Sequence, residues 1–182
     1  MRIISGKARG TKLYTLEGNL TRPTLDRVKE SLFNILQNDI NDCVFLDMFS
    51  GSGAIGLEAA SRGAKKVILC DKNKQAIEII EKNIQKTHLE NNVVLYKKDF
   101  ENMLDNLNEK IDIVYIDPPY KTDLAYKAVK KLLDSNLLTY NTLVIIETDE
   151  EERILEQIKE LKIKVVNKRK YGRIHLIFIN RS

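Results

Sequence analysis

Strand-like and helix-like segments alternate along most of this chain, and that alternation constrains the fold more than any other feature. From residue 43 onward, short apolar runs rich in Val and Ile alternate with longer segments whose apolar residues recur at helical spacing. The strand-like segments are 43–47, 66–71, 93–97, 111–117, 143–148, 163–169 and 174–179, and the helix-like segments are about 54–62, 73–87, 100–107, 123–133 and 151–160. This succession of β-then-α units predicts an α/β fold with a doubly wound, mostly parallel, seven-stranded sheet.

The two ends of the sequence add shorter elements. Residues 2–16 contain two β-prone stretches around Gly6 and Gly10, which predicts a small N-terminal hairpin. A helix should follow, with Thr24 as its N-cap. The last two strand segments have only a short connection, so we expect an antiparallel hairpin at or near a sheet edge. We expect a single domain over 1–182, in which residues 1–38 form an N-terminal extension and residues 43–182 form the core.

Charge is distributed unevenly along the 182 residues. Residues 1–30 hold seven basic and three acidic residues, and residues 162–182 hold seven basic residues and no acid. The middle, 31–161, has a net charge of −7. Two basic ends would attract phosphate if they met on one face of the fold, and the alternative is two solvated charged tails.

Several protein classes are disfavoured by the composition. The chain has two cysteines, two histidines and no Cys-x-x-Cys, so we expect no metal site. Apolar runs such as 143–146 are too short to cross a bilayer, and the N-terminus lacks the apolar core of a signal peptide. We therefore expect a cytoplasmic protein that does not bind membranes and keeps its thiols reduced.

A glycine-rich loop follows the first core strand and opens a helix. Glycines there let the backbone turn sharply and approach a ligand. The candidate ligand-binding residues in this loop are Ser50, Gly51, Ser52, Gly53 and Gly56. The Gly-x-Gly-x-x-Gly pattern by itself is also found in dinucleotide-binding proteins.

Acidic residues at the ends of successive strands favour a particular ligand, S-adenosylmethionine. Asp47 would repel a pyrophosphate but suits the cationic amino-acid end of that cofactor. Asp71 is placed to bind ribose hydroxyls. Asp99 can accept from an adenine amino group, with Phe100 flanking the ring. Asp71 or Asp99 alone would more often be a helix cap, but three acids at the ends of three successive strands favour the ligand-binding interpretation.

The Asp117-Pro118-Pro119-Tyr120 motif is the strongest chemical signal. The two prolines end the fourth strand and present carbonyl acceptors without a competing N–H. Asp117 and the Pro118 carbonyl can each accept a hydrogen of an exocyclic amino group, which frees the nitrogen lone pair to face a methyl donor. Asp117 also stabilises positive charge developing on that nitrogen, and Tyr120 can stack on the base.

Three blocks of sequence resemble the RsmD-type bacterial small-subunit rRNA (guanine-N2)-methyltransferases, which are class I S-adenosylmethionine-dependent enzymes. The blocks are Met1–Gly6 with Arg9-Gly10, Arg22–Leu36, and Gly51–Ala64, together with Asp117–Tyr120. The resemblance covers nearly the whole chain and implies a Rossmann-like fold. It further implies N2-methylation of one guanine in 16S rRNA, within the small ribosomal subunit or its assembly intermediate. We expect the protein to be a monomer.

Basic residues of the N-terminal block are candidates for contacting RNA phosphates beside the Asp117 loop. They are Arg2, Lys7, Arg9, Lys12, Arg22 and Arg27. Arg22 is expected to reach the active site, because Pro23 restricts its backbone. The alternative for Arg22 is an exposed arginine before a helix.

Three other functions remain open at this point. A DNA or RNA methyltransferase acting on adenine N6 or cytosine N4 would use the same loop chemistry, but such enzymes usually carry an added target-recognition domain. A nicotinamide-dependent oxidoreductase is disfavoured by Asp47 and the Asp117 loop. A non-catalytic RNA-binding protein is disfavoured by the intact motif, and a methyl-transfer assay would distinguish it.

Overall fold

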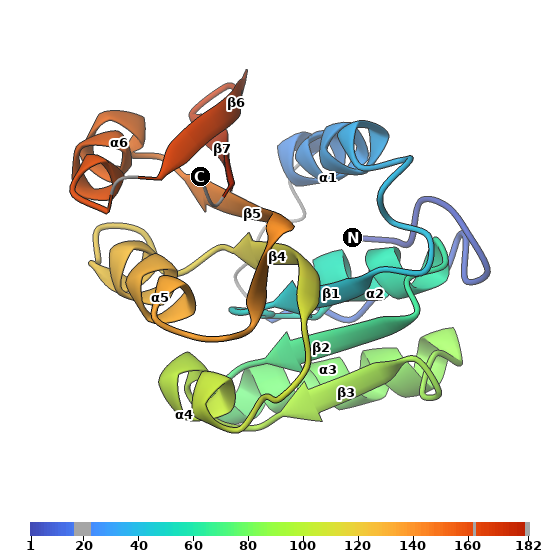
Figure 1. Cartoon of the computed structure of the whole chain (residues 1–182). Coiled ribbons are helices and arrows are strands. Elements are labelled where there is room, and N and C mark those ends of the chain that lie inside the picture. The colour runs from blue at the N-terminus through green and yellow to red at the C-terminus, as the bar shows by residue number, and fades with distance from the viewer. Residues whose placement is uncertain (17–22, 162, 181–182) are drawn as a thin grey trace.

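Seven strands form one mixed sheet at the centre of the computed structural model, which describes residues 1–16, 23–161 and 163–180 (Figure 1). The order across the sheet is β3-β2-β1-β4-β5-β7-β6. The strands are β1 Val44–Asp47, β2 Lys66–Cys70, β3 Val93–Tyr96, β4 Ile111–Ile116, β5 Leu138–Thr148, β6 Lys164–Tyr171 and β7 Ile174–Asn180. Neighbours from β3 to β5 pair in parallel, and β7 pairs antiparallel with both β5 and β6. The predicted C-terminal hairpin at the sheet edge is therefore confirmed.

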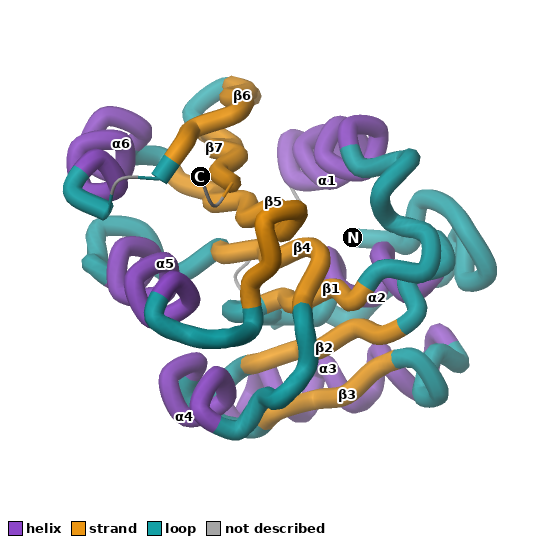
Figure 2. Tube along the Cα trace, viewed as in Figure 1, coloured by secondary structure: helices purple, strands orange, loops and turns teal. Residues whose placement is uncertain are grey.

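Six helices cover the two faces of this sheet, as the coloured tube shows (Figure 2). Their bounds are α1 Pro23–Ile35, α2 Ala54–Ser61, α3 Lys74–Thr87, α4 Phe100–Asp105, α5 Leu124–Leu133 and α6 Glu151–Lys159. Apolar residues of α1, α2 and α3 belong to one core cluster, and those of α4, α5 and α6 belong to the other. Helices on both faces make this a doubly wound α/β sheet, as the alternating pattern predicts.

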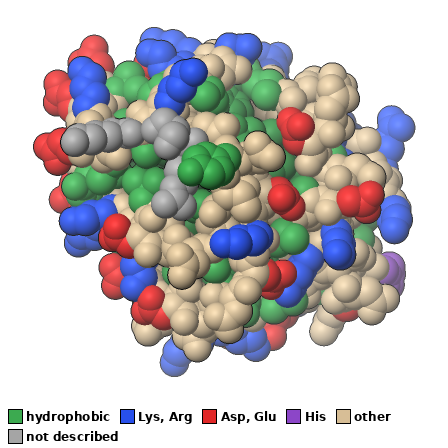
Figure 3. Space-filling model, in the orientation of Figure 1, with side chains coloured by type: hydrophobic (Ala, Val, Ile, Leu, Met, Phe, Trp, Pro, Cys, Tyr) green, Lys and Arg blue, Asp and Glu red, His purple; other side chains and the backbone are tan. Residues whose placement is uncertain are grey.

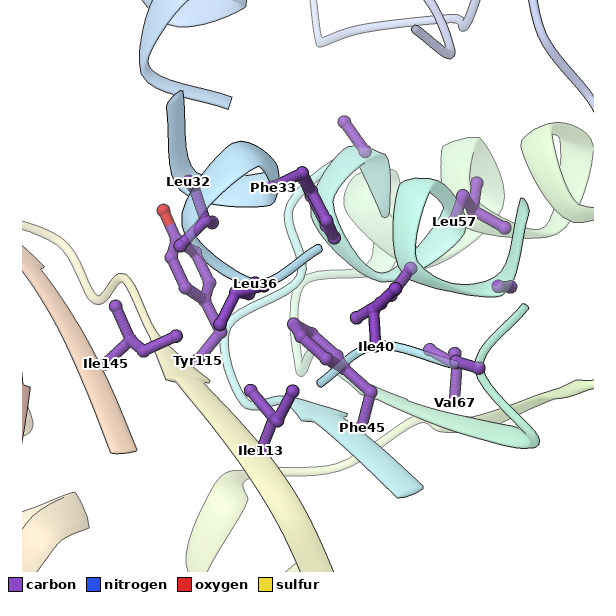
Figure 4. Packing of buried hydrophobic residues seen from close by; sticks show 14 of the residues in the cluster. Leu32, Phe33, Leu36, Ile40, Phe45, Leu57, Val67, Ile113, Tyr115 and Ile145 are labelled. Carbon is purple, nitrogen blue, oxygen red and sulfur yellow. The ribbon is translucent and has the colours of Figure 1, made fainter. Parts of the chain in front are cut away.

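Helix α1 closes the first core cluster over the middle of the sheet (Figure 4). Leu32 and Leu36 point toward Tyr115 on β4. The ring of Phe33 stacks against Phe45 on β1, with centroids 6.4 Å apart. All five side chains are at most 2% exposed, so α1 is part of the core that supports the strand ends.

The expected N-terminal hairpin is present in the structure as a short one. Residues 1–16 contain a single antiparallel bridge, between Arg2 and Lys12, and no strand. The backbone N–H groups of Ile4 and Ser5 donate to the Glu58 carboxylate on α2, at 2.7 and 3.0 Å. Backbone hydrogen bonds from Ile3 to Thr11, from Gly10 to Ile3 and from Leu13 to Met1 join the two stretches, so the prediction of a short hairpin is confirmed, and Glu58 ties this hairpin to α2.

The start of α1 also differs from the expectation. The helix begins at Pro23, so Thr24 lies inside its first turn rather than at the N-cap. Proline suits a first helical position because its fixed φ is already helical and its missing N–H would have no partner there.

Candidate active site

A cleft of about 820 Å³ opens at the carboxyl ends of β1, β2, β3 and β4. The strand order reverses between β1 and β4, and ligands in such sheets bind outside the carboxyl ends at that switch point. The residues that line it include Gly51, Asp71, Asp99, Phe100 and all of Asp117–Tyr120. Segments far apart in the sequence therefore meet at one place, as their positions at strand ends predict.

The glycine loop reaches this cleft through Gly51. Its φ is +56°, and a Cβ built on it would have nothing within 4 Å, so the backbone borders open space. The Gly51 N–H donates to Asp71 Oδ2 at 2.9 Å. Gly53 (φ +77°) sits at the N-cap of α2 in the left-handed region, a conformation that favours glycine.

Three other loop residues have structural partners. The Ser50 hydroxyl donates to the Asp47 carbonyl and accepts from the Cys70 N–H, both at 2.9 Å. The Ser52 carbonyl accepts from the Asn83 amide at 2.9 Å. A Cβ on Gly56 would lie 2.2 Å from Leu69 Cδ2, so this glycine lets α2 pack closely on β2.

Asp47 lies beneath the loop. It is 1% exposed, accepts the Gly56 N–H at 3.1 Å, and is not among the described residues that line the cleft. Burial raises the pKa of its carboxyl to about 7, against the lowering effect of the Gly56 hydrogen bond. The structure therefore gives Asp47 a loop-supporting contact and does not bring it to the cleft surface with Asp71 and Asp99.

Asp71 and Asp99 line the cleft and also make cap-like hydrogen bonds. Asp71 Oδ1 accepts the Asn73 N–H at 2.9 Å, and Asp99 caps α4 by accepting the Asn102 N–H at 2.9 Å. The hydrogen bonds from Asn102 lower the pKa of Asp99, which keeps it ionised. A carboxylate oxygen has more than one lone pair, so each side chain keeps capacity for a ligand. Phe100 is 6% exposed and packs against Phe49, with centroids 5.4 Å apart.

Asp117 leaves the end of β4 with acidic neighbours on both sides. Burial raises its pKa well above the ordinary range, and the charges of Glu147 and Asp47 raise it further. Tyr120 donates its hydroxyl to Glu147 Oε1 at 3.3 Å. Pro118 and Pro119 complete the wall, so the motif forms one continuous side of the cleft.

Sequence reasoning missed two polar residues that organise this site. Glu147, at the end of β5, is 4% exposed and hydrogen-bonds Tyr115 and Tyr120. The signal was an acid directly after the apolar run Leu143–Ile146, the same pattern that identified Asp117. Asn83 is fully buried and joins Ser52 of the glycine loop to the Tyr14 backbone. Its position inside a helix gave no sign of this.

The candidate RNA-contacting residues occupy separate places. Arg2, Lys7, Arg9, Lys12 and Arg27 are exposed, and Arg22 lies outside the described residues. Lys7 and Arg9 share a recess of about 400 Å³ with Lys86 and the segment 87–92 at the C-terminal end of α3. That end is about 17 Å along the helix from Ala76, which lines the cleft.

The two basic ends of the chain lie on different supporting elements. Residues 1–16 pack on α2 and α3, whereas β6 is the sheet edge opposite β3. On the face shown in Figure 3, basic and acidic side chains are interspersed. Within the described ranges, His, Cys, Asp and Glu form no group suited to hold a metal ion. None of the helices described there is long and apolar enough to cross a membrane.

Comparison with known proteins assigns this chain to a family of methyltransferases. The family model Conserved hypothetical protein 95 matches residues 1–180. Ribosomal RNA small subunit methyltransferase D of Haemophilus influenzae is 38% identical over 158 residues, which cover 85% of this chain and 82% of that protein. Putative rRNA methyltransferase YlbH of Bacillus subtilis is 34% identical over 94% of each chain. The structure of putative methyltransferase yhhF from Escherichia coli superposes with a TM-score of 0.85 at 30% identity, covering 100% of this chain and 98% of that one. The chain therefore belongs to the Conserved hypothetical protein 95 family, the RsmD-type class I methyltransferases.

Proposed function

We propose that this protein transfers a methyl group from S-adenosylmethionine to the exocyclic N2 of one guanine in 16S rRNA, within the small ribosomal subunit or an assembly intermediate. The observation that carries the proposal is the shared cleft: the Asp117–Tyr120 wall faces the same space as Gly51, Asp71 and Asp99. An amino-group site and a cofactor site in one cleft are what direct methyl transfer requires.

The residues present fit S-adenosylmethionine. Asp71 would bind the ribose hydroxyls, Asp99 the adenine amino group, and Phe100 would flank the ring. The open space beside Gly51 lets the backbone approach the cofactor without a side chain between them. Asp47 would act from below, by holding the Gly56 N–H and hence the start of α2.

The chain's own groups supply positioning and electrostatic stabilisation. When bound, S-adenosylmethionine supplies a methyl group whose bond to sulfur breaks, with its electron pair left on sulfur, as the nitrogen lone pair forms the new N–C bond. Asp117 and the Pro118 carbonyl accept the two amino hydrogens and direct the lone pair into the cleft. The Asp117 carboxylate also stabilises the positive charge on nitrogen until the nitrogen passes one proton to solvent water and becomes a neutral secondary amine. Tyr120 holds the base by stacking.

The RNA target is supported by the names of the relatives and by charge. Two of the relatives are described as methyltransferases of ribosomal RNA. Arg2, Lys7, Arg9, Lys12, Arg22 and Arg27 would contact phosphates. The recess with Lys86 puts Lys7 and Arg9 far from the reacting base, so their contact would be with a remote part of the RNA backbone.

The deciding experiment is methyl transfer from labelled S-adenosylmethionine to small ribosomal subunits from cells that lack this protein, followed by nucleoside analysis. Label in N2-methylguanosine is the expected result. Label in N6-methyladenosine or N4-methylcytidine, or transfer only to DNA, would keep the chemistry and overturn the guanine target. No transfer to subunits, naked RNA or DNA by protein that binds the cofactor would refute the proposed function.

A further inference from the structure

Glu147 is a buried carboxylate beside the reacting loop, and the proposed reaction gives it no task. It ends the apolar part of β5 and is 4% exposed. The Tyr115 hydroxyl donates to its Oε2, and the Tyr120 hydroxyl donates to its Oε1 at 3.3 Å. Both tyrosine hydroxyls are the donors and the two carboxylate oxygens are the acceptors, and these hydrogen bonds oppose the rise that burial causes in the pKa of Glu147.

Strand register places this group next to Asp117. Tyr115 pairs with Ile145 and Ile116 with Ile146 in the parallel β4–β5 ladder. The next residue in each segment is Asp117, directly after the end of β4, and Glu147 on β5. Alternate residues of a strand share a face, so Tyr115, Asp117 and Glu147 point to the same side of the sheet.

We propose that Glu147 is a positioning residue for the transfer: Tyr115 anchors its carboxylate from the core, and the carboxylate holds the Tyr120 hydroxyl so that this ring is fixed in the cleft wall beside Asp117. The inference rests on the proposed function, because it assigns Tyr120 to the base. Tyr115 is 2% exposed and is packed under α1, so the anchor end of the chain of hydrogen bonds is rigid.

The geometry of the Tyr120–Glu147 hydrogen bond, at the cleft end of this network, suits a contact that shortens when substrate binds. The 3.3 Å separation between Tyr120 and Glu147 is longer than a usual hydroxyl hydrogen bond of about 2.7–2.8 Å. Hydrogen bonds in free enzymes are often long and shorten when the substrate is bound. A base stacked on Tyr120 would press the ring into the wall and bring its hydroxyl toward Glu147.

Glu147 also sets the charge around Asp117. The groups acting on Asp117 are Glu147 from β5 and Asp47 from β1, and both are acidic. Tyr115 and Tyr120 are the groups that hydrogen-bond Glu147, and the charge of Asp149 raises the pKa of Tyr120. Removing the charge of Glu147 should therefore lower the pKa of Asp117. Because only the ionised form of Asp117 stabilises the positive charge that develops on the amino nitrogen, the acidic limb of the rate profile should move to lower pH.

The test compares Glu147→Gln, Tyr120→Phe and the double variant in the methyl-transfer assay. Each single change should raise the KM for RNA substrate about tenfold, the effect expected for losing one hydrogen bond to a charged group. The KM of the double variant should not exceed the higher of the two single-variant KM values, because both changes remove the same contact. The S-adenosylmethionine dissociation constant should stay unchanged. In Glu147→Gln alone, the acidic limb of kcat/KM should shift to lower pH.

Glu109→Gln is the matched control. Glu109 lies before β4, at the opposite end from Asp117, and pairs with Lys66 at 2.5 Å, so its loss removes a charge and an ion pair far from the cleft. It should leave KM and the pH profile unchanged. Tyr120→Phe keeps the test valid if Glu147→Gln is poorly folded, because it leaves the buried carboxylate in place.

Two results would overturn the positioning role. One is a Tyr120→Phe variant with wild-type KM, and the other is a double variant whose loss equals the product of the two single losses. Both require that the wild-type protein methylates RNA in the same assay. Absence of wild-type transfer would instead refute the proposed function.

Discussion

Asp47 ends β1 and Asp117 directly follows the neighbouring strand β4, and the two carboxylates have different surroundings. Asp47 is buried under the glycine loop and hydrogen-bonded to the Gly56 N–H, whereas Asp117 lines the cleft. The same side chain thus supports the loop in one position and faces the substrate space in the other. Burial and access to the cleft therefore distinguish the two roles.

Replacing Asp117 with Asn should separate chemistry from cofactor binding. An amide keeps the shape but presents a donor and no negative charge to the amino nitrogen. We expect kcat to fall at least about a hundredfold, as when other charge-stabilising groups are removed. The cofactor dissociation constant, measured by calorimetry, should change little. Asp71→Asn should do the reverse and weaken cofactor binding. Turnover near the wild-type rate in Asp117→Asn would contradict the mechanism.

Asp47 predicts a specific dependence of stability on pH. Its pKa is about 7 in the folded protein against 3.8 for the free side chain. The folded state therefore binds more protons between these values, and stability should fall as pH rises through this range. The neutral Asp47→Asn variant lacks this loss. The unfolding free energy of the variant minus that of the wild type should therefore be larger at pH 8 than at pH 4. The upper bound on this relative gain is about 4 kcal/mol for three pKa units. If denaturation curves gave the same difference in unfolding free energy between variant and wild type at pH 4 and at pH 8, this role of Asp47 would be excluded.

At the scale of elements, helix α2 joins the N-terminal segment to the cofactor loop. Glu58 is fully buried and accepts from Ile4, Ser5 and Arg62, and it pairs with Lys29 of α1 at 3.1 Å. Burial lowers the pKa of Lys29, and the nearby Glu58 charge opposes that shift. One carboxylate thus connects α1, α2 and the first residues of the chain.

Glu58→Gln should release the N-terminal segment. The change leaves Lys29, 1% exposed, without its counter-charge, and breaking a buried pair in this way typically costs about 3–5 kcal/mol. We expect a lower melting temperature and faster amide exchange at Ile4 and Ser5. Glu81→Gln is the control, because its pair with Lys97 is about half exposed and worth less than about 1 kcal/mol. Equal effects of the two changes would rule out an anchoring role for Glu58.

At the scale of the whole molecule, the sheet brings distant loops together, while Lys7 and Arg9 lie away from the cleft. The switch point between β1 and β4 gathers the loops after four strands into one cleft. Lys7, Arg9 and Lys86 lie at the far end of α3, and Lys86 rests 4.2 Å from the centre of the Tyr14 ring. RNA that reached both places would have to extend along α3.

Charge reversal tests that extended contact. Lys7→Glu, Arg9→Glu and Lys86→Glu together should weaken binding to small subunits and reduce the slope of log K against log salt by about 2, because fewer counterions are released. The control reverses three exposed lysines elsewhere, Lys110, Lys130 and Lys159, for the same change in net charge. If the slope falls by the same amount in both triple variants, the change in net charge explains the effect and the recess is not an RNA contact.

The sequence by itself determined the succession of strands and helices along the chain and most of the residues that line the cleft. Period and apolar runs are local properties, and parallel strands bring their carboxyl ends together, so Gly51, Asp71, Asp99 and Asp117 could be assigned to one site. Only the tertiary structure decided which polar groups are buried among those ends. Glu147 and Asn83 acquire partners from segments remote in the chain, and Asp47 lies below the cleft surface. Only the tertiary structure shows that the short N-terminal hairpin is tied to α2, because Ile4 and Ser5 donate to the Glu58 carboxylate. Hydrogen-bond partners and burial depend on packing in three dimensions, which no local pattern records.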